Sequence, residues 1–158
     1  MVVNTKLFGE VTVSDDKIIT FAQGIIGFED LKKFTILYDI DLKNKHSVSW
    51  LQSLDEPSLA FPVINPYLIK EDYKPEIDDE LIATLGPISE LDLTVLVTIS
   101  VPKDISLMSC NIKAPIVINS DTKCGGQFIA QNQDYPVKYY IYDRLKEKQL
   151  VKGEEAEC

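Results

Sequence analysis

Short runs of β-prone residues separated by turn-forming residues make up most of this chain, and few architectures accommodate such a pattern. The strand-favouring residues Val, Ile, Phe, Tyr and Thr concentrate in these runs. The runs lie at 2–6, 10–13, 18–21, 34–38, 48–54, 59–64, 93–101, 107–112, 116–119 and 127–130. They do not alternate with helices, which argues against a parallel sheet with crossover connections. We therefore predict an all-β fold, an antiparallel β-barrel or a strongly bent sandwich, with one short helix.

The short helix is predicted to begin near Asp78. Apolar residues recur at helical spacing through Leu81, Ile82 and Leu85, and Gly86-Pro87 ends the pattern. Acidic residues fill the first turn, where the positive end of the helix dipole favours them.

Three further predictions concern the sheet. The continuous run 93–101 is expected to be a buried central strand, and 48–54 and 59–64 are expected to form a hairpin. Pro62 cannot donate a backbone hydrogen bond, so its strand should be at an edge or bulged there, leaving that edge available to a partner.

The chain has 158 residues, which suits one domain with one core. We assign residues 1–142 to a single β domain and 143–158 to a charged tail, either frayed or forming a short helix within 145–151. No apolar run approaches the roughly 20 residues that span a bilayer, and the polar start does not resemble a signal peptide. We therefore expect a cytoplasmic protein that does not bind membranes.

The three cysteines are far apart and lack Cys-x-x-Cys spacing, which argues against a disulfide framework. A turn is predicted over 120–126, so Cys124, beside Gly125 and Gly126, should be an exposed thiol. We assign it no role.

The formal net charge is -9 and the sequence pI is near 4.6, which disfavours direct binding to nucleic acid. More than half of this charge lies within 71–80, where six acidic residues face only Lys74, a sum of -6 + 1 = -5. The six are Glu71, Asp72, Glu76, Asp78, Asp79 and Glu80. The cluster is either a solvated loop and helix start, or a surface that steers a basic protein partner.

Residue types that can carry catalysis are present, but their spacing in the sequence does not match a catalytic motif. His46, the single histidine, lies in a polar loop at 39–47 that we expect to be mobile, and the Cys and His residues are too scattered for a zinc site. Pairs such as Asp15-Asp16, Asp55-Glu56 and Asp78-Asp79 fall at turns or at the helix start, where capping explains them. We predict a protein that is not an enzyme and uses no cofactor or metal.

A surface feature remains at 24–28, where Gly24 and Gly27 bracket two isoleucines. Ile25, Ile26 and Phe28 either plug one end of the barrel or form an apolar docking site for a partner.

Five phrases in order resemble the FliW family of flagellar assembly factors. They are TKLFGE at 5–10, IITFAQGIIGFE at 18–29, WLQSLDEPSLAF at 50–61, APIVIN at 114–119 and DYPV at 134–137. The match covers about residues 4–138, and beyond it the sequence carries no family inference.

The resemblance implies a β-barrel-like cytoplasmic protein without enzymatic activity. It implies two partners, flagellin and the RNA-binding translational regulator CsrA, whose repression of flagellin synthesis would be relieved by binding. Two alternatives from other classes stay open. One is a barrel that binds a small molecule or hydrolyses one with carboxylates in its mouth, and the other is a general export chaperone.

Overall fold

The structure is a computed structural model, and it describes residues 1–38, 48–87 and 92–147. The strands are β1 (Val2–Thr5), β2 (Gly9–Thr12), β3 (Ile19–Phe21), β4 (Lys33–Tyr38), β5 (Ser49–Ser53), β6 (Ala60–Ile64), β7 (Leu93–Ser100), β8 (Ser109–Cys110), β9 (Ile116–Asn119), β10 (Cys124–Gln127) and β11 (Tyr139–Tyr140). The helices are α1 (Asp79–Ala83) and α2 (Tyr142–Glu147), with short 3-10 turns at Asp15–Lys17, Pro66–Leu68 and Ile105–Leu107.

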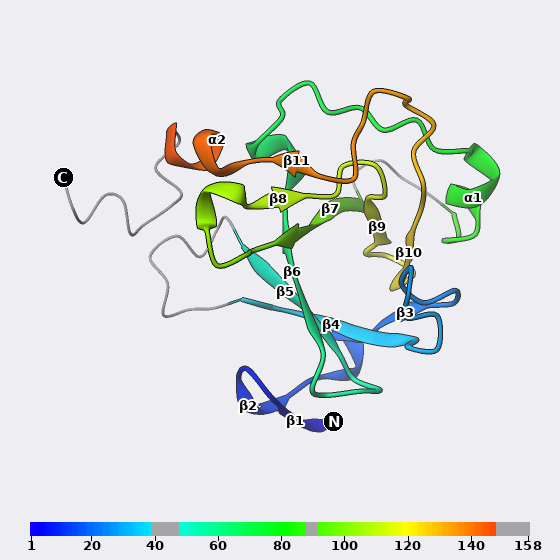
Figure 1. Cartoon of the computed structure of the whole chain (residues 1–158). Coiled ribbons are helices and arrows are strands. Elements are labelled where there is room, and N and C mark those ends of the chain that lie inside the picture. Colours follow the sequence, from blue (N-terminus) through cyan, green and yellow to red (C-terminus); the bar gives the residue numbers. More distant parts are fainter. Residues whose placement is uncertain (39–47, 88–91, 148–158) are drawn as a thin grey trace.

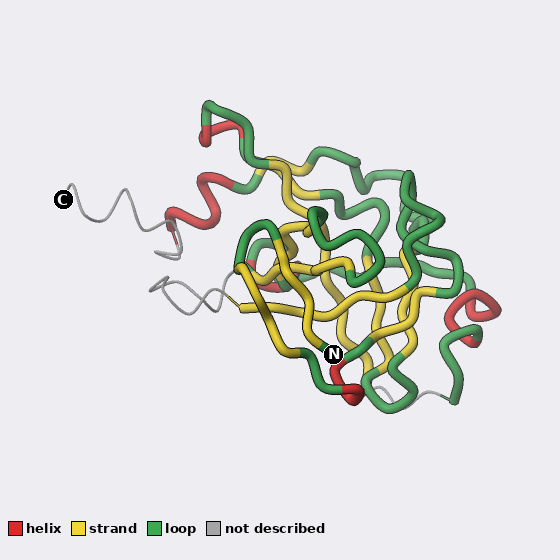
Figure 2. The backbone as a smooth tube through the Cα atoms, turned by 90° about the horizontal axis from the view of Figure 1, so that it is seen from below, coloured by secondary structure: helices red, strands yellow, loops and turns green. Residues whose placement is uncertain are grey.

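Seven strands close into a barrel in the order β7-β6-β5-β4-β3-β10-β9, because β9 also pairs with β7. Neighbours are antiparallel except β3 and β10, which are parallel. β8 and β11 extend the sheet beyond the C-terminal end of β7. Strands occupy the middle of the molecule and the short helices lie at its periphery (Figures 1 and 2). The predicted fold class is confirmed, with one parallel pair and a second short helix added.

The barrel interior is filled by alternate residues of its strands, because side chains in a strand point to opposite faces in turn. Phe21 and Phe34 lie at its centre, 5.1 Å apart between ring centroids in an edge-to-face arrangement. Gly125 in β10 passes directly beneath Phe21, since a Cβ atom at this position would lie 2.7 Å from the Phe21 ring. The glycine is needed for close packing rather than for a turn.

A second core covers the outer face of β6 and β7. Val97 and Ile99 of β7 meet Tyr73, Ile112 and Leu145, which come from the segments that wrap around this face. Leu145 belongs to α2 and is only 3% exposed, so this helix packs onto the fold. The boundary assigned at residue 142 stays a prediction.

The N-terminal hairpin of β1 and β2 forms a smaller cluster. Val3 and Val13 pack with Leu54, and Phe8 meets Trp50 edge to face with ring centroids 6.3 Å apart. The hairpin therefore covers the start and end of β5 from outside the barrel.

Several local predictions are confirmed. Asp78 caps α1 by accepting a hydrogen bond from the backbone N–H of Glu80, and Gly86 leaves the helix with a φ of 95°. β5 and β6 form the predicted hairpin, and Asp55 stabilises its turn by accepting hydrogen bonds from the backbone N–H groups of Lys32 and Lys33. β7 is central, with partners on both sides.

Other local predictions are wrong or only partly right. Gly125 and Gly126 lie in β10, not in a turn, because the strand begins at Cys124. The run 107–112 contains only the two residues of β8, since a 3-10 turn takes its start. β6 is an inner strand, but it pairs with β7 only at Val63 and Ile64, so Pro62 has its register partner only in β5, at Trp50. The loop 39–47, with His46, and the tail from 148 onward lie outside the described residues.

Candidate functional site

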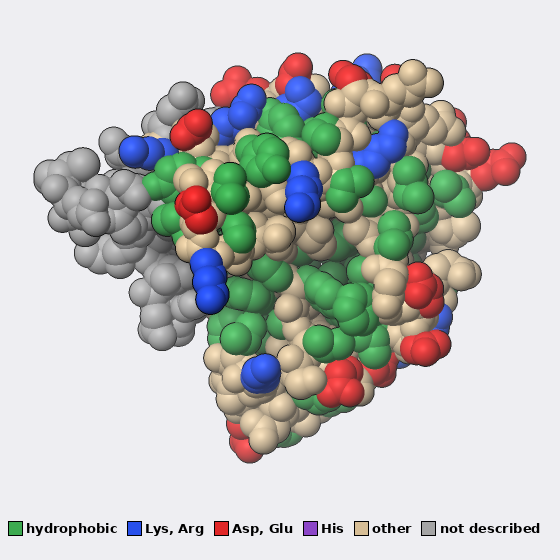
Figure 3. All heavy atoms as spheres, in the orientation of Figure 1, with side chains coloured by type: hydrophobic (Ala, Val, Ile, Leu, Met, Phe, Trp, Pro, Cys, Tyr) green, Lys and Arg blue, Asp and Glu red, His purple; other side chains and the backbone are tan. Residues whose placement is uncertain are grey.

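The acidic segment, residues 71–80, lies on the surface as an extended strap followed by α1. All six of its acidic side chains are exposed, whereas Tyr73 between them is buried. In the space-filling view, acidic side chains form the edge of the molecule where α1 lies (Figure 3). The segment therefore presents its carboxylates to solvent while one aromatic side chain anchors it.

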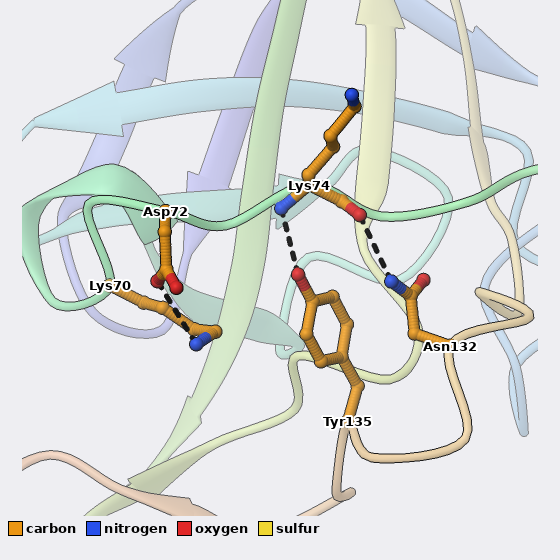
Figure 4. Close-up of polar contacts among 5 residues, drawn as sticks. All are labelled: Lys70, Asp72, Lys74, Asn132 and Tyr135. Atoms are coloured by element: carbon orange, nitrogen blue, oxygen red, sulfur yellow. Dashed lines mark hydrogen bonds and ion pairs between the residues drawn. The ribbon is translucent and has the colours of Figure 1, made fainter.

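A second strap, residues 131–135, fixes the backbone of the acidic segment. The hydroxyl oxygen of Tyr135 accepts a hydrogen bond from the backbone N–H of Lys74 at 2.8 Å, and the side-chain amide of Asn132 donates to the Lys74 carbonyl at 3.0 Å (Figure 4). Asn132 also accepts from the backbone N–H of Glu76, and the backbone N–H of Gln131 donates to the Glu76 carbonyl, both at 2.7 Å. Because Asn132 bonds the strap through both its amide oxygen and its amide nitrogen, the backbone of the acidic segment is fixed at Lys74 and Glu76.

Aromatic rings support this arrangement from beneath. Tyr73 and Tyr135 stack with ring centroids 5.2 Å apart, and the buried Tyr73 hydroxyl donates to the carbonyl of Ile112 at 2.8 Å. Burial raises the pKa of the Tyr73 hydroxyl far above its ordinary value, with smaller contributions from its neighbours. The hydroxyl is therefore a structural donor.

One acidic residue is partly neutralised by a neighbouring lysine. Lys70 and Asp72 form an ion pair at 3.0 Å, and this hydrogen bond lowers the pKa of Asp72 and raises the pKa of Lys70. The Lys70 ammonium also lies 5.7 Å from the ring centroid of Tyr135. Asp72 is thus a weaker candidate for contact with a basic partner than the acids of α1.

The 24–28 bend separates the three apolar candidates. Ile25 is 3% exposed and packs in the barrel core, whereas Ile26 is 51% exposed and Phe28 is 39% exposed. Phe28 rests edge to face on Phe61, with 5.1 Å between ring centroids. Ile25 therefore belongs to the barrel core, whereas a docking role for the exposed Ile26 and Phe28 stays a prediction.

Residues 127–131 connect the bend to the acidic segment, which the sequence did not indicate. The side-chain oxygen of Gln127 accepts a hydrogen bond from the backbone N–H of Ile26 at 2.9 Å, and four residues later Gln131 bonds Glu76. Ile129 between them is 62% exposed. Strand propensity at 127–130 concealed this link, because one hydrogen bond to the Gln127 side chain and one from the Gln131 backbone leave no periodic signal.

The possible metal ligands of the described residues do not cluster, and neither described thiol is fully exposed. Within 1–38, 48–87 and 92–147, no three His, Cys, Asp or Glu side chains gather closely enough to hold a metal ion. Cys110 is buried and Cys124 is half-buried, with its thiol directed to the carbonyl of Thr122. Among the helices of the described part, none has the length and apolar character required to cross a bilayer.

Comparison with known proteins assigns the family. A family model described as FliW protein matches residues 2–141. The chain belongs to the FliW family. The matched region includes the bend, the acidic segment and the 127–131 segment that connects them.

Relatives within the FliW family are similar along their whole length. The flagellar assembly factor FliW of Lachnospira eligens is 49% identical over 150 residues, which are 94% of this chain and 99% of the relative. That of Lachnoclostridium phytofermentans is 46% identical over 158 residues and covers 100% of both chains. A crystal structure of the flagellar assembly factor FliW superposes with a TM-score of 0.81 at 30% identity, covering 90% of this chain and 97% of the other.

Proposed function

We propose that this FliW-family chain is a non-enzymatic cytoplasmic assembly factor that binds flagellin and a CsrA-type translational regulator. While flagellin occupies the factor, the regulator is free to repress the flagellin message. Once flagellin is exported, the freed factor captures the regulator and synthesis resumes. The proposal rests on family membership together with an exposed acidic surface, whose strap is held by hydrogen bonds with Asn132 and Tyr135.

The acidic segment supports the part of this proposal that concerns the regulator. A protein that binds RNA through Lys and Arg presents a basic surface, and a fixed acidic surface increases its rate of encounter. Asp79 and Glu80 project from the first turn of α1, and hydrogen bonds to Asn132 and Tyr135 hold the strap that leads to it. Because the backbone is already ordered, little conformational entropy is lost on binding.

The exposed apolar residues support the part that concerns flagellin. Ile26 lies at the tip of the bend and Ile129 on the connecting segment, which Gln127 ties to the bend. Apolar residues exposed near one another on a rigid frame suit an apolar helical face of a client. Ile25, which is buried, supports the bend from below.

Competition titration tests the proposal. Purified protein is titrated with flagellin and with the regulator, first separately and then with one partner already bound. We expect each to bind and each to weaken the other, because a partner switch requires that one partner lowers the affinity for the second, and such coupling is reciprocal. Failure of both to bind would refute the proposal, and a general export chaperone would instead retain many unrelated unfolded proteins from a lysate.

A further inference from the structure

Among the residues that the structure describes, a cavity of about 480 Å³ lies at the end of the barrel opposite the 24–28 bend, where β3 begins and β4 ends. This volume falls within the range of roughly 300–1,000 Å³ that is typical of small-molecule sites. Its wall consists of aliphatic and hydroxyl side chains, and its charged residues are Asp16, Lys17 and Lys123.

The floor of this cavity is formed by the apolar residues of the barrel that lie nearest to this end. Ile19 and Ile118 belong to the core cluster, and the partly buried Ile36 packs against it. Thr94 pairs with Ile118 across β7 and β9, two residues before the buried Leu96, and it is exposed. A small polar residue therefore occupies an inward position at the mouth, where a large apolar one would have completed the packing.

Two lysines and one carboxylate line the charged part of the mouth. Asp16 accepts a hydrogen bond from the Ser14 hydroxyl at 2.6 Å, which is the main cause of its lowered pKa, and Lys17 and Lys123 contribute further. Among the described residues that line the cavity, the lysines exceed the carboxylate by one positive charge, in a chain whose net charge is -9. The local field thus favours an anion at this end of the barrel.

The position of Lys123 is set by an unusual backbone. Its φ is 58°, a left-handed conformation that no other non-glycine among the described residues adopts. Side chains with a branched or long Cβ substituent enter this region at a cost, so surrounding contacts must hold the residue there.

Buried Asn119 provides those contacts. Its side-chain oxygen accepts from the backbone N–H of Asp121 at 3.0 Å, and its amide donates to the carbonyl of Leu85 at 3.2 Å. Its backbone carbonyl accepts from the N–H of Lys123 at 2.9 Å. The turn that carries Lys123 is therefore fixed to the end of the α1 segment, and the ammonium group, which donates to the carbonyl of Ser120 at 2.5 Å, lies at the wall of the cavity.

We infer that this mouth binds a small amphipathic monocarboxylate. The hydrocarbon chain occupies the cavity above Ile36 and Ile118, and the carboxylate lies near Lys17 and Lys123. Burial of the chain stabilises the complex in proportion to the apolar area removed from water. Asp16 opposes the anion and limits its affinity. This site is independent of the proposed protein partners.

The test uses the full chain, octanoate as the probe and 1-octanol as its uncharged analogue, with binding measured by isothermal titration calorimetry. Thr94→Phe fills the mouth without altering any charge. Lys123→Gln removes a charge at the mouth, and Lys103→Gln removes the same charge beyond the far end of β7. Asp16→Asn removes the opposing carboxylate.

We expect octanoate to bind with a stoichiometry near one and to raise the melting temperature, because a ligand of the native state stabilises it. Thr94→Phe should abolish binding. Lys123→Gln should weaken it roughly threefold to fivefold, as for a partly exposed ion pair, while Lys103→Gln leaves it unchanged.

Asp16→Asn should tighten octanoate binding by a similar factor and leave the affinity for 1-octanol unaffected. Misfolding of the variant could not produce such a gain in affinity. The inference is overturned if octanoate does not saturate the native protein, if Thr94→Phe binds it as well as the original chain, or if 1-octanol binds as tightly as octanoate.

Discussion

The hydroxyl oxygen of Tyr135 accepts a hydrogen bond from the backbone N–H of Lys74 at 2.8 Å, joining segments 61 residues apart in the sequence. The Tyr135 ring at the same time stacks on Tyr73. One side chain thus joins the outer core to the acidic segment.

Tyr135→Phe should keep the ring stacking but leave the N–H of Lys74 without its acceptor. We expect the free energy of unfolding to fall by about 0.5–1.5 kcal/mol, the usual net contribution of one hydrogen bond, because Lys74 is exposed and water can replace the lost acceptor. Amide hydrogen exchange at residues 74–76 should accelerate. Tyr140→Phe, at a tyrosine that is 55% exposed, is the matched control and should change neither quantity.

Neutralising the acidic first turn of α1 should slow association with the CsrA-type regulator. In the variant Asp78→Asn, Asp79→Asn, Glu80→Gln, the asparagine at 78 preserves the helix cap. Stopped-flow association at low salt should become about tenfold slower, because electrostatic steering is reduced. Its dependence on salt should also weaken, and an unchanged rate at low salt would remove this cluster from the mechanism.

Ile26→Ser should weaken flagellin binding without unfolding the protein, because the side chain is 51% exposed. A loss of roughly tenfold corresponds to about 1.4 kcal/mol of apolar contact. Ile105→Ser, at an isoleucine that is 41% exposed on another part of the surface, controls for general hydrophobicity. Phe28→Ser should act in the same direction but also reduce stability, since Phe28 packs on Phe61. Retained affinity in both bend variants would show that the bend serves only the core.

Gly125→Ala should destabilise the barrel. The added Cβ would lie 2.7 Å from the Phe21 ring, which is fully buried and has no room to move. Overpacking of this kind costs about 1–3 kcal/mol, measurable by urea denaturation. Gly9→Asn is the comparison, because its surroundings are open and Asn tolerates a φ of 66°. An equal loss in both variants would contradict the packing argument.

The buried thiol of Cys110 should make stability fall at alkaline pH. Desolvation raises the pKa of Cys110 from 9.0 to about 12, with a smaller opposing effect of Arg144. Above pH 9.0 the unfolded chain loses this proton while the folded chain retains it, so the thiol's contribution is complete below pH 9.0 and is lost towards pH 12. The slope approaches about 1.4 kcal/mol per pH unit at most. In Cys110→Ala the free energy of unfolding should decline less steeply over this interval, and identical slopes would refute the assignment.

Much of the fold could be predicted because it depends on local patterns. Runs of β-prone residues separated by turn-forming residues predicted the strands, Asp78 and Gly86 marked the ends of α1, and the 55–58 turn predicted the β5–β6 hairpin. These signals lie within a few residues of one another, so the sequence alone carries them. The order of the family phrases likewise indicated the FliW family before any contact was known.

What depends on distant residues required the tertiary structure. Gly125 was assigned to a turn because glycine favours turns, yet it is needed for the approach of Phe21 from another strand. Ile25 and Ile26 are neighbours in the sequence with opposite environments, since the bend directs one into the barrel core and the other into solvent.

The six acidic residues were evident from composition, but their rigidity was not. It arises from Tyr135 and Asn132, far along the chain, whose single hydrogen bonds produce no periodic pattern. The sequence by itself thus determined the class of fold, the family and the charge of the surface, because these follow from local propensity and residue type. Only closure of the barrel decided which side chains meet, which are buried and where the mouth opens, because those outcomes depend on contacts between segments that local chemistry does not link.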